Sequence, residues 1–236
     1  GRIFIGNGSD EAIDIAFRIF CRPGLDNAVS IAPTYGMYRV AAATNDVQMR
    51  EVPLGAGYSL PVGALLAAAD ERTKLMWLCS PNNPTGNAFP DREIEELLRR
   101  FDGVVVLDEA YIDFAEGRGF LPRLDEFPNL IVLQTLSKAW GMAGLRLGLA
   151  FASERIAALF VAVPHFPDSF KIGHLADDTG HFLQPGPCTT VMAAVARDDL
   201  IALAVLFRAD GGGGHNAVFL DRPHQIVHRF IVLHLV

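Results

Sequence analysis

A lysine follows an apolar stretch of this chain in a setting that suits covalent chemistry. Lys138 comes shortly after the apolar run 129–133, with Ser137 directly before it and Arg146 eight residues after it. A lysine amine attacks a carbonyl carbon when it loses its proton readily, and burial and neighbouring cations promote that loss. We therefore expect Lys138 to be a buried nucleophile at the carboxyl end of a strand, bonded to an aldehyde. A solvated loop lysine is the alternative, because most lysines are exposed.

A carboxylate ends the most apolar run of the chain, residues 104–107. Asp108 at that position either caps a helix or pairs with a buried cation, since an unpaired buried charge is strongly unfavourable. A protonated pyridine nitrogen would be a suitable cation, and keeping it protonated makes the ring an electron sink. Tyr111 follows three residues later and could reach a hydroxyl on the same ring.

Two further loops could hold such a ring. Asn83 lies in the turn 80–86, which two prolines and a glycine stiffen, and its amide could donate to the ring hydroxyl. Tyr35 follows the apolar run 28–31 and could stack on the flat ring. Ordinary core packing is the alternative for this tyrosine.

The stretch from Gly6 to Glu11 could bind a phosphate group. It follows a strand and opens a helix, so its backbone amides can face an anion, and Ser9 or Asp10 can cap the helix. A tight turn with a helix cap explains the same residues without any ligand. Ser137 and Arg146 could complete a phosphate site, because a guanidinium matches phosphate oxygens. A surface ion pair is the alternative for Arg146.

Short apolar runs alternate with helical patterns along the first two thirds of the chain. Alternation of this kind predicts a layered α/β domain with a largely parallel sheet, in which ligands bind at the carboxyl ends of the strands. We expect strands at residues 3–5, 28–31, 75–78, 104–107, 130–133 and 145–151, and helices at about residues 10–20, 35–43, 62–69 and 91–100.

Composition limits the class of protein. The 236 residues are 50% hydrophobic with a net charge of −7 and no basic stripe, so we expect no nucleic-acid partner. Cys21, Cys79 and Cys188 form no C-x-x-C pair, which suits a reducing cytoplasm. No apolar stretch is long enough for a membrane span, and the start has no signal pattern. Because Gly1 enters a strand almost at once, we expect residues upstream to be missing.

The composition changes abruptly near Phe160. All seven histidines come after it, whereas glutamate, tyrosine and tryptophan stop. We therefore divide the chain into a domain at residues 1–160 and a tail at residues 161–236, which is either a second domain or, as we favour, a foreign or out-of-frame segment. His224 and His228 in this tail have a helical i, i+4 spacing, but no carboxylate or cysteine joins them in a ligand spacing, so we expect no metal site.

Five motifs occur in the order found in one enzyme family. They occupy residues 7–11, 33–38, 80–86, 108–114 and 135–148. From about residue 2 to residue 156 the chain resembles the fold-type I, pyridoxal-phosphate-dependent class I/II aminotransferases, and among them most closely the histidinol-phosphate aminotransferases. The resemblance implies a three-layer α/β/α large domain, incomplete at its N-terminus, and the cofactor pyridoxal 5′-phosphate.

The resemblance also implies a role for each candidate residue. Lys138 would bond to the cofactor aldehyde and move the proton between the substrate Cα and the cofactor, and Asp108 would pair with the pyridine nitrogen. The other implied cofactor contacts are Asn83 and Tyr111 at the ring hydroxyl, Tyr35 against the ring, and Ser9, Asp10, Ser137 and Arg146 around the phosphate. The resemblance also implies a homodimer. The implied reaction is reversible amino transfer between L-histidinol phosphate and 2-oxoglutarate, a step of histidine biosynthesis. L-Histidinol phosphate is a small amino-acid phosphate substrate.

Two alternatives stay open. Related pyridoxal-phosphate enzymes, such as threonine-phosphate decarboxylases or aromatic aminotransferases, share the cofactor residues but act on other substrates. The chain could also be a non-catalytic remnant that binds the cofactor, because the small C-terminal domain expected beyond about Phe160 is not recognisable.

Overall fold

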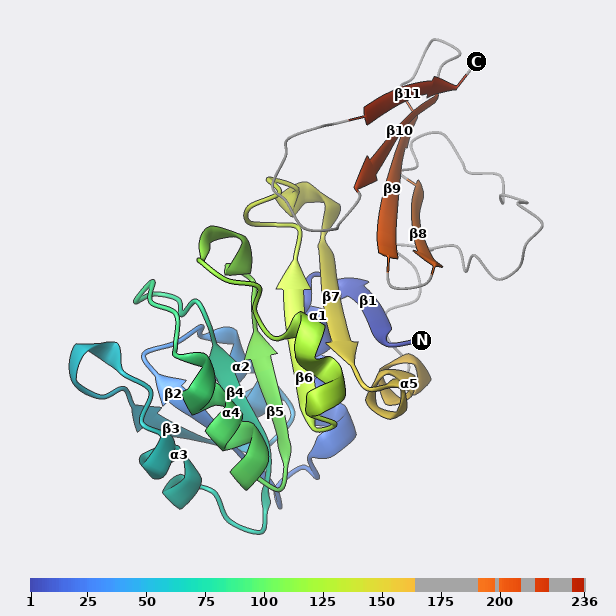
Figure 1. The fold of residues 1–236 in the computed structure, drawn as a ribbon. Coiled ribbons are helices and arrows are strands. Elements are labelled where there is room, and N and C mark those ends of the chain that lie inside the picture. Colours follow the sequence, from blue (N-terminus) through green and yellow to red (C-terminus); the bar gives the residue numbers. More distant parts are fainter. Residues whose placement is uncertain (164–190, 198–199, 209–214, 221–230, 236) are drawn as a thin grey trace. The chain divides into compact units, whose positions relative to one another are not determined.

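The computed structural model describes residues 1–163, 191–197, 200–208, 215–220 and 231–235 (Figure 1). The chain divides into two compact units, Gly1–His165 and Phe166–Val236. Each unit is described by itself.

The first unit is built on a seven-stranded sheet with the order β1-β7-β6-β5-β4-β2-β3. The strands are parallel from β3 across to β6, whereas β7 pairs antiparallel with both β6 and β1. Because the carboxyl ends of the parallel strands meet at one edge of the sheet, the residues that follow them are brought together. The strands are β1 (Ile3–Asn7), β2 (Asn27–Ala32), β3 (Gln48–Pro53), β4 (Thr73–Cys79), β5 (Val104–Asp108), β6 (Leu130–Thr135) and β7 (Leu147–Ala152).

Helices cover both faces of this sheet (Figure 1). One layer holds α1 (Ser9–Phe20), α2 (Met37–Thr44) and α5 (Glu154–Ala162), and the other holds α3 (Val62–Ala68) and α4 (Asp91–Arg100). Short 3₁₀ turns lie in the connections, at Ala56–Tyr58, Ile112–Phe114, Leu121–Glu126 and Ala143–Leu145. Within the described residues, no helix has the length and apolar character that a membrane crossing requires.

The burial of the central strands explains their composition. Every residue of β6 is buried, and so are four of the five residues of β5. A parallel strand covered on both faces needs a continuous apolar run, which is the pattern both segments carry. Helix α4 instead buries a single stripe, Ile94, Leu97 and Leu98, at the spacing of an amphipathic helix.

The predicted α/β architecture is confirmed, and three local expectations need correction. Strand β3 has no counterpart among the predicted strands, because Val52 is its only buried residue and an edge strand of this kind has no apolar run. The strand predicted at residues 145–151 begins only at Leu147, because Arg146 has a φ of 50° and ends a 3₁₀ turn. Helix α2 begins at Met37, which leaves Tyr35 in the preceding loop.

The second unit contains a four-stranded antiparallel sheet with the order β11-β10-β9-β8. Its strands are β8 (Val191–Arg197), β9 (Leu200–Arg208), β10 (His215–Leu220) and β11 (Ile231–Leu235). The foreign origin of the tail stays a prediction. His224 and His228, the two histidines with helical spacing, lie outside the described residues.

The start of α1 lies directly against β7. Gly8 precedes the helix with a φ of 80°, a conformation that glycine adopts without strain. A Cβ atom added at Gly148 on β7 would lie 2.2 Å from the backbone nitrogen of Ser9 and the carbonyl carbon of Gly8. Only glycine at position 148 therefore allows this approach, which fixes the first turn of α1 at the edge of the sheet.

We predict that Gly148→Ala lowers the free energy of unfolding by about 2 kcal/mol, because the added methyl group meets backbone atoms that cannot move aside. Chemical denaturation of the full chain measures this loss. Gly144→Ala is the control, since a Cβ atom there meets no atom within 4 Å, and it should change the stability by less than about 0.5 kcal/mol. Equal losses in both variants would contradict the packing argument.

Candidate active site

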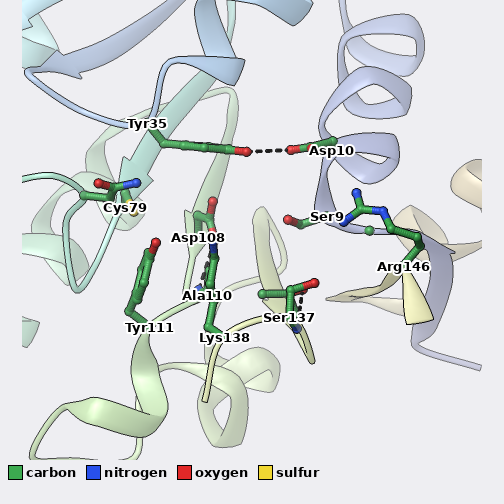
Figure 2. Close-up of a pocket in the computed structure, with 13 residues that line it drawn as sticks. Ser9, Asp10, Tyr35, Cys79, Asp108, Ala110, Tyr111, Ser137, Lys138 and Arg146 are labelled. Atoms are coloured by element: carbon green, nitrogen blue, oxygen red, sulfur yellow. Dashed lines mark hydrogen bonds between the residues drawn. The ribbon is translucent and has the colours of Figure 1, made fainter. Parts of the chain in front are cut away.

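A pocket opens where β4, β5 and β6 end (Figure 2). Its volume is about 480 Å³, counting the open mouth. All of the residues predicted to bind a cofactor line it: Ser9, Asp10, Tyr35, Asn83, Asp108, Tyr111, Ser137, Lys138 and Arg146. Gly8, Cys79, Ala110 and Thr135 complete the lining. The fold thus gathers side chains from distant parts of the sequence at one edge of the sheet.

Asp108 lies at the bottom of this pocket and is only 2% exposed. Its carboxylate accepts a hydrogen bond of 3.0 Å from the Ala110 backbone N–H and one of 2.6 Å from the Tyr38 hydroxyl. Burial, together with the charge of Asp10, raises the pKa of Asp108 above its usual value, although these two hydrogen bonds and the charge of Lys138 act in the opposite direction. A buried carboxylate held in this way can receive a cationic group from the pocket side.

Lys138 lines the pocket and is exposed to solvent. Its ammonium nitrogen is 5.4 Å from the centre of the Tyr111 ring, a distance suited to a cation–π contact. The expectation that Lys138 is buried is wrong. Strand β6 ends at Thr135, and the turn that follows it carries Lys138 to an exposed position. A hydrogen bond of 3.0 Å from the Gly141 N–H to the Lys138 carbonyl closes that turn.

Tyr35 forms one side of the pocket, opposite Lys138 in the view of Figure 2. Its hydroxyl donates to the Asp10 carboxylate at 3.0 Å. Burial, followed by the charge of Asp10, raises the pKa of Tyr35, so the hydroxyl keeps its proton. This hydrogen bond orients the tyrosine ring and joins the loop after β2 to the first turn of α1.

The end of the pocket formed by Ser9 and Arg146 is suited to an anion (Figure 2). The prediction that Ser9 or Asp10 caps α1 is wrong, since Gly8 occupies the cap position and makes no side-chain hydrogen bond there. Arg146 lies so close to Gly8 that a Cβ atom on this glycine would be 2.8 Å from its Nη2 atom. A helix N-terminus and a guanidinium group together favour phosphate oxygens.

Asn82 joins the two loops that carry Tyr35 and Asn83. It is 2% exposed, and its Nδ2 donates to the Pro33 carbonyl at 3.0 Å and to Thr85 Oγ1 at 2.7 Å. Its Oδ1 accepts a hydrogen bond of 2.8 Å from Thr34 Oγ1. The loop after β2 and the loop after β4 therefore hold one another in place.

Sequence reasoning missed three residues of this site. Asn82 was counted only as part of a stiff turn, and Tyr38 carries no signal that separates it from an ordinary buried tyrosine. Cys79 was expected to be a core residue, and it is buried, as is Cys21, while Cys188 lies outside the described residues. Burial and the charge of Asp108 raise the pKa of Cys79 to about 12, so its thiol lines the pocket in the protonated form.

Comparison with known proteins identifies the family. The sequence profile of the family "Aminotransferase class I and II" matches residues 1–202. The chain belongs to this family. The resemblance carried by the five motifs is thereby confirmed, and residues of all five motifs line the pocket.

Individual relatives show how far the similarity extends. The chain is 58% identical over 163 residues to the histidinol-phosphate aminotransferase of Bacteroides thetaiotaomicron, a match that covers 69% of this chain and 47% of that protein. It is 59% identical over 154 residues to the enzyme of the same name from Bacteroides fragilis strain YCH46, covering 65% and 45%. The chain therefore spans about half the length of the curated relatives it matches.

Solved structures give the same result for the fold. The crystal structure of histidinol-phosphate aminotransferase from Sinorhizobium meliloti, in complex with pyridoxal-5′-phosphate, matches with a TM-score of 0.63 and 26% sequence identity. The match covers 69% of this chain and 45% of that one. Over the matched part, this chain thus has the fold of that aminotransferase structure.

We predict that Asn82→Ala lowers the free energy of unfolding by about 2 kcal/mol, because buried hydrogen-bonding groups lose their partner. Chemical denaturation measures the change. Asn45→Ala is the comparison, because Asn45 is only half-buried and makes its hydrogen bonds to Asp14 and the Ala41 carbonyl nearer the solvent. This variant should lose less than about 1 kcal/mol of unfolding free energy. If Asn82→Ala is as stable as Asn45→Ala or more stable, Asn82 does not hold the two loops together.

Proposed function

We propose that this chain is the cofactor-binding part of a histidinol-phosphate aminotransferase that uses pyridoxal 5′-phosphate. The observation that carries the proposal is the pocket itself, which combines an amine, a buried carboxylate and an anion-binding end. The identity of 58% to the Bacteroides thetaiotaomicron protein of that name supports the assignment.

The residues of the pocket fit the chemical groups of this cofactor. Its pyridine nitrogen is basic, and the buried Asp108 carboxylate would bind that nitrogen in the protonated form. Its flat ring would lie against Tyr35, and Asn83 and Tyr111 would bind the ring hydroxyl. The phosphate would be held by Arg146 with Ser9, Ser137 and the first amides of α1, while the backbone at Asp10 would contribute without its carboxylate, which Tyr35 occupies.

The protein groups would divide the chemistry among them. Bound pyridoxal phosphate supplies an electron-withdrawing ring that makes the Cα–H bond of an amino substrate acidic. Lys138 would hold the aldehyde carbon of the cofactor until the substrate amine displaces it, and its freed amine would then move the proton from the substrate Cα to that carbon. Asp108 would keep the ring nitrogen protonated, and Tyr35 would exclude water from one face of the ring.

We further propose L-histidinol phosphate and 2-oxoglutarate as the substrates and a cytoplasmic homodimer as the working form. The names of the curated relatives support histidinol phosphate as the amino substrate, and the free, buried Cys21 and Cys79 are compatible with a reducing compartment. Because the chain spans about half of those relatives, cofactor binding without turnover is the second function to test.

We predict that pyridoxal phosphate added to the purified chain gives a visible absorbance band and that Lys138→Ala abolishes it. The Lys74→Ala variant is the control, because the Lys74 amine instead donates to the Glu71 carbonyl away from the pocket. Adding L-histidinol phosphate should bleach the band, and 2-oxoglutarate should restore it. A band that histidinol phosphate leaves unchanged would favour the non-catalytic alternative, and no band in the wild type would refute cofactor binding.

We predict that Arg146→Ala weakens the binding of pyridoxal phosphate about 10-fold, because one charge-assisted contact to the phosphate is lost. Binding of pyridoxal, which lacks the phosphate, should be unchanged in the same variant. Fluorescence titration measures both affinities, and Arg155→Ala, an exposed arginine of α5, serves as the matched control. Equal weakening for both ligands would place Arg146 outside the phosphate site.

A further inference from the structure

Tyr38 lies behind the wall of the pocket and reaches the carboxylate at its bottom. It is 1% exposed, and its hydroxyl donates to Asp108 Oδ2 at 2.6 Å. The other oxygen, Oδ1, accepts the hydrogen bond from the Ala110 backbone. Each carboxylate oxygen thus has one protein donor, and together the two donors fix the plane in which Asp108 meets the pocket.

The Tyr38 ring is itself held by aromatic neighbours. It stacks on Trp77 with the ring centres 4.9 Å apart and the planes 20° apart, and Trp77 stacks in turn on Phe17 at 5.2 Å. On its other side the edge of Tyr38 meets Tyr35, with the ring centres 5.6 Å apart and the planes at 81°. Tyr38 therefore contacts both Asp108 and Tyr35, two residues that line the pocket.

The protonation of these groups gives the hydrogen bond its direction. Burial and the charge of Asp108 hold the pKa of Tyr38 well above its usual value, so the hydroxyl remains a donor. The same hydrogen bond lowers the pKa of Asp108 against the effect of burial. Tyr38 therefore favours the charged carboxylate, which is the form that a protonated ring nitrogen requires.

We propose that Tyr38 is a positioning residue that orients the Asp108 carboxylate toward the cofactor ring nitrogen. This inference rests on the proposed function, because it requires pyridoxal phosphate in the pocket. Tyr38 would act only through Asp108, so its hydroxyl should matter for a ligand that has the ring nitrogen and not for one that lacks it.

The test compares two ligands in the variant Tyr38→Phe, which keeps the ring and its stacking and removes the hydroxyl. One ligand is pyridoxal phosphate, and the other is 1-deazapyridoxal phosphate, in which a C–H group replaces the ring nitrogen. Fluorescence titration of the full chain should show about 10-fold weaker binding of pyridoxal phosphate, a loss typical of a hydrogen bond to a charged group. Binding of the deaza analogue should change less than about 2-fold.

The controls separate the possible outcomes. Tyr58→Phe removes the hydroxyl of an exposed tyrosine and should leave both affinities unchanged. In an Asp108→Asn background, Tyr38→Phe should cause no further loss of pyridoxal phosphate binding. Equal weakening for both ligands, or no weakening for either, would overturn the positioning role. Wild-type protein that fails to bind pyridoxal phosphate would overturn the proposed function itself, and this result is recognised before any variant is made.

Discussion

The burial of the Asp108 carboxylate is the constraint around which the pocket is arranged. A charge placed at the end of the buried strand β5 is unfavourable unless donors and a cation surround it. The protein supplies the Ala110 amide and the Tyr38 hydroxyl, and Tyr38 is fixed in turn by its stacking on Trp77. The carboxylate lines the pocket, and a protonated pyridine nitrogen there would supply the cation that balances its negative charge.

The sheet topology brings the other groups to the same place. Parallel strands β4, β5 and β6 end side by side, so the loops that follow them deliver Asn83, Tyr111 and Lys138 to one edge. The antiparallel strand β7 brings Gly148 against the start of α1, and Arg146 immediately before β7 comes to lie beside Gly8. A guanidinium group, a helix N-terminus and an amine thus line one cavity, although they come from separate elements of the chain.

Much of this arrangement could be predicted from the sequence, because it depends on local patterns. Apolar runs indicated the buried strands, and the polar residues directly after them indicated the pocket. All of the residues predicted to bind a cofactor line this pocket. Strand β3 was missed because only Val52 is buried in it, and the exposure of Lys138 depends on the path of a turn. The link from Tyr38 to Asp108 joins residues 70 positions apart, so no local pattern could indicate it.

We propose Lys138 as the amine that bonds to pyridoxal phosphate. The chain has only three lysines, Lys74, Lys138 and Lys171, so the site of attachment can be mapped without ambiguity. Pyridoxal phosphate is added to the purified chain, the bond is reduced with borohydride, and the digested protein is analysed by mass spectrometry. We expect one phosphopyridoxyl group, on Lys138. A label spread over all three lysines, or carried mainly by Lys74 or Lys171, would contradict it.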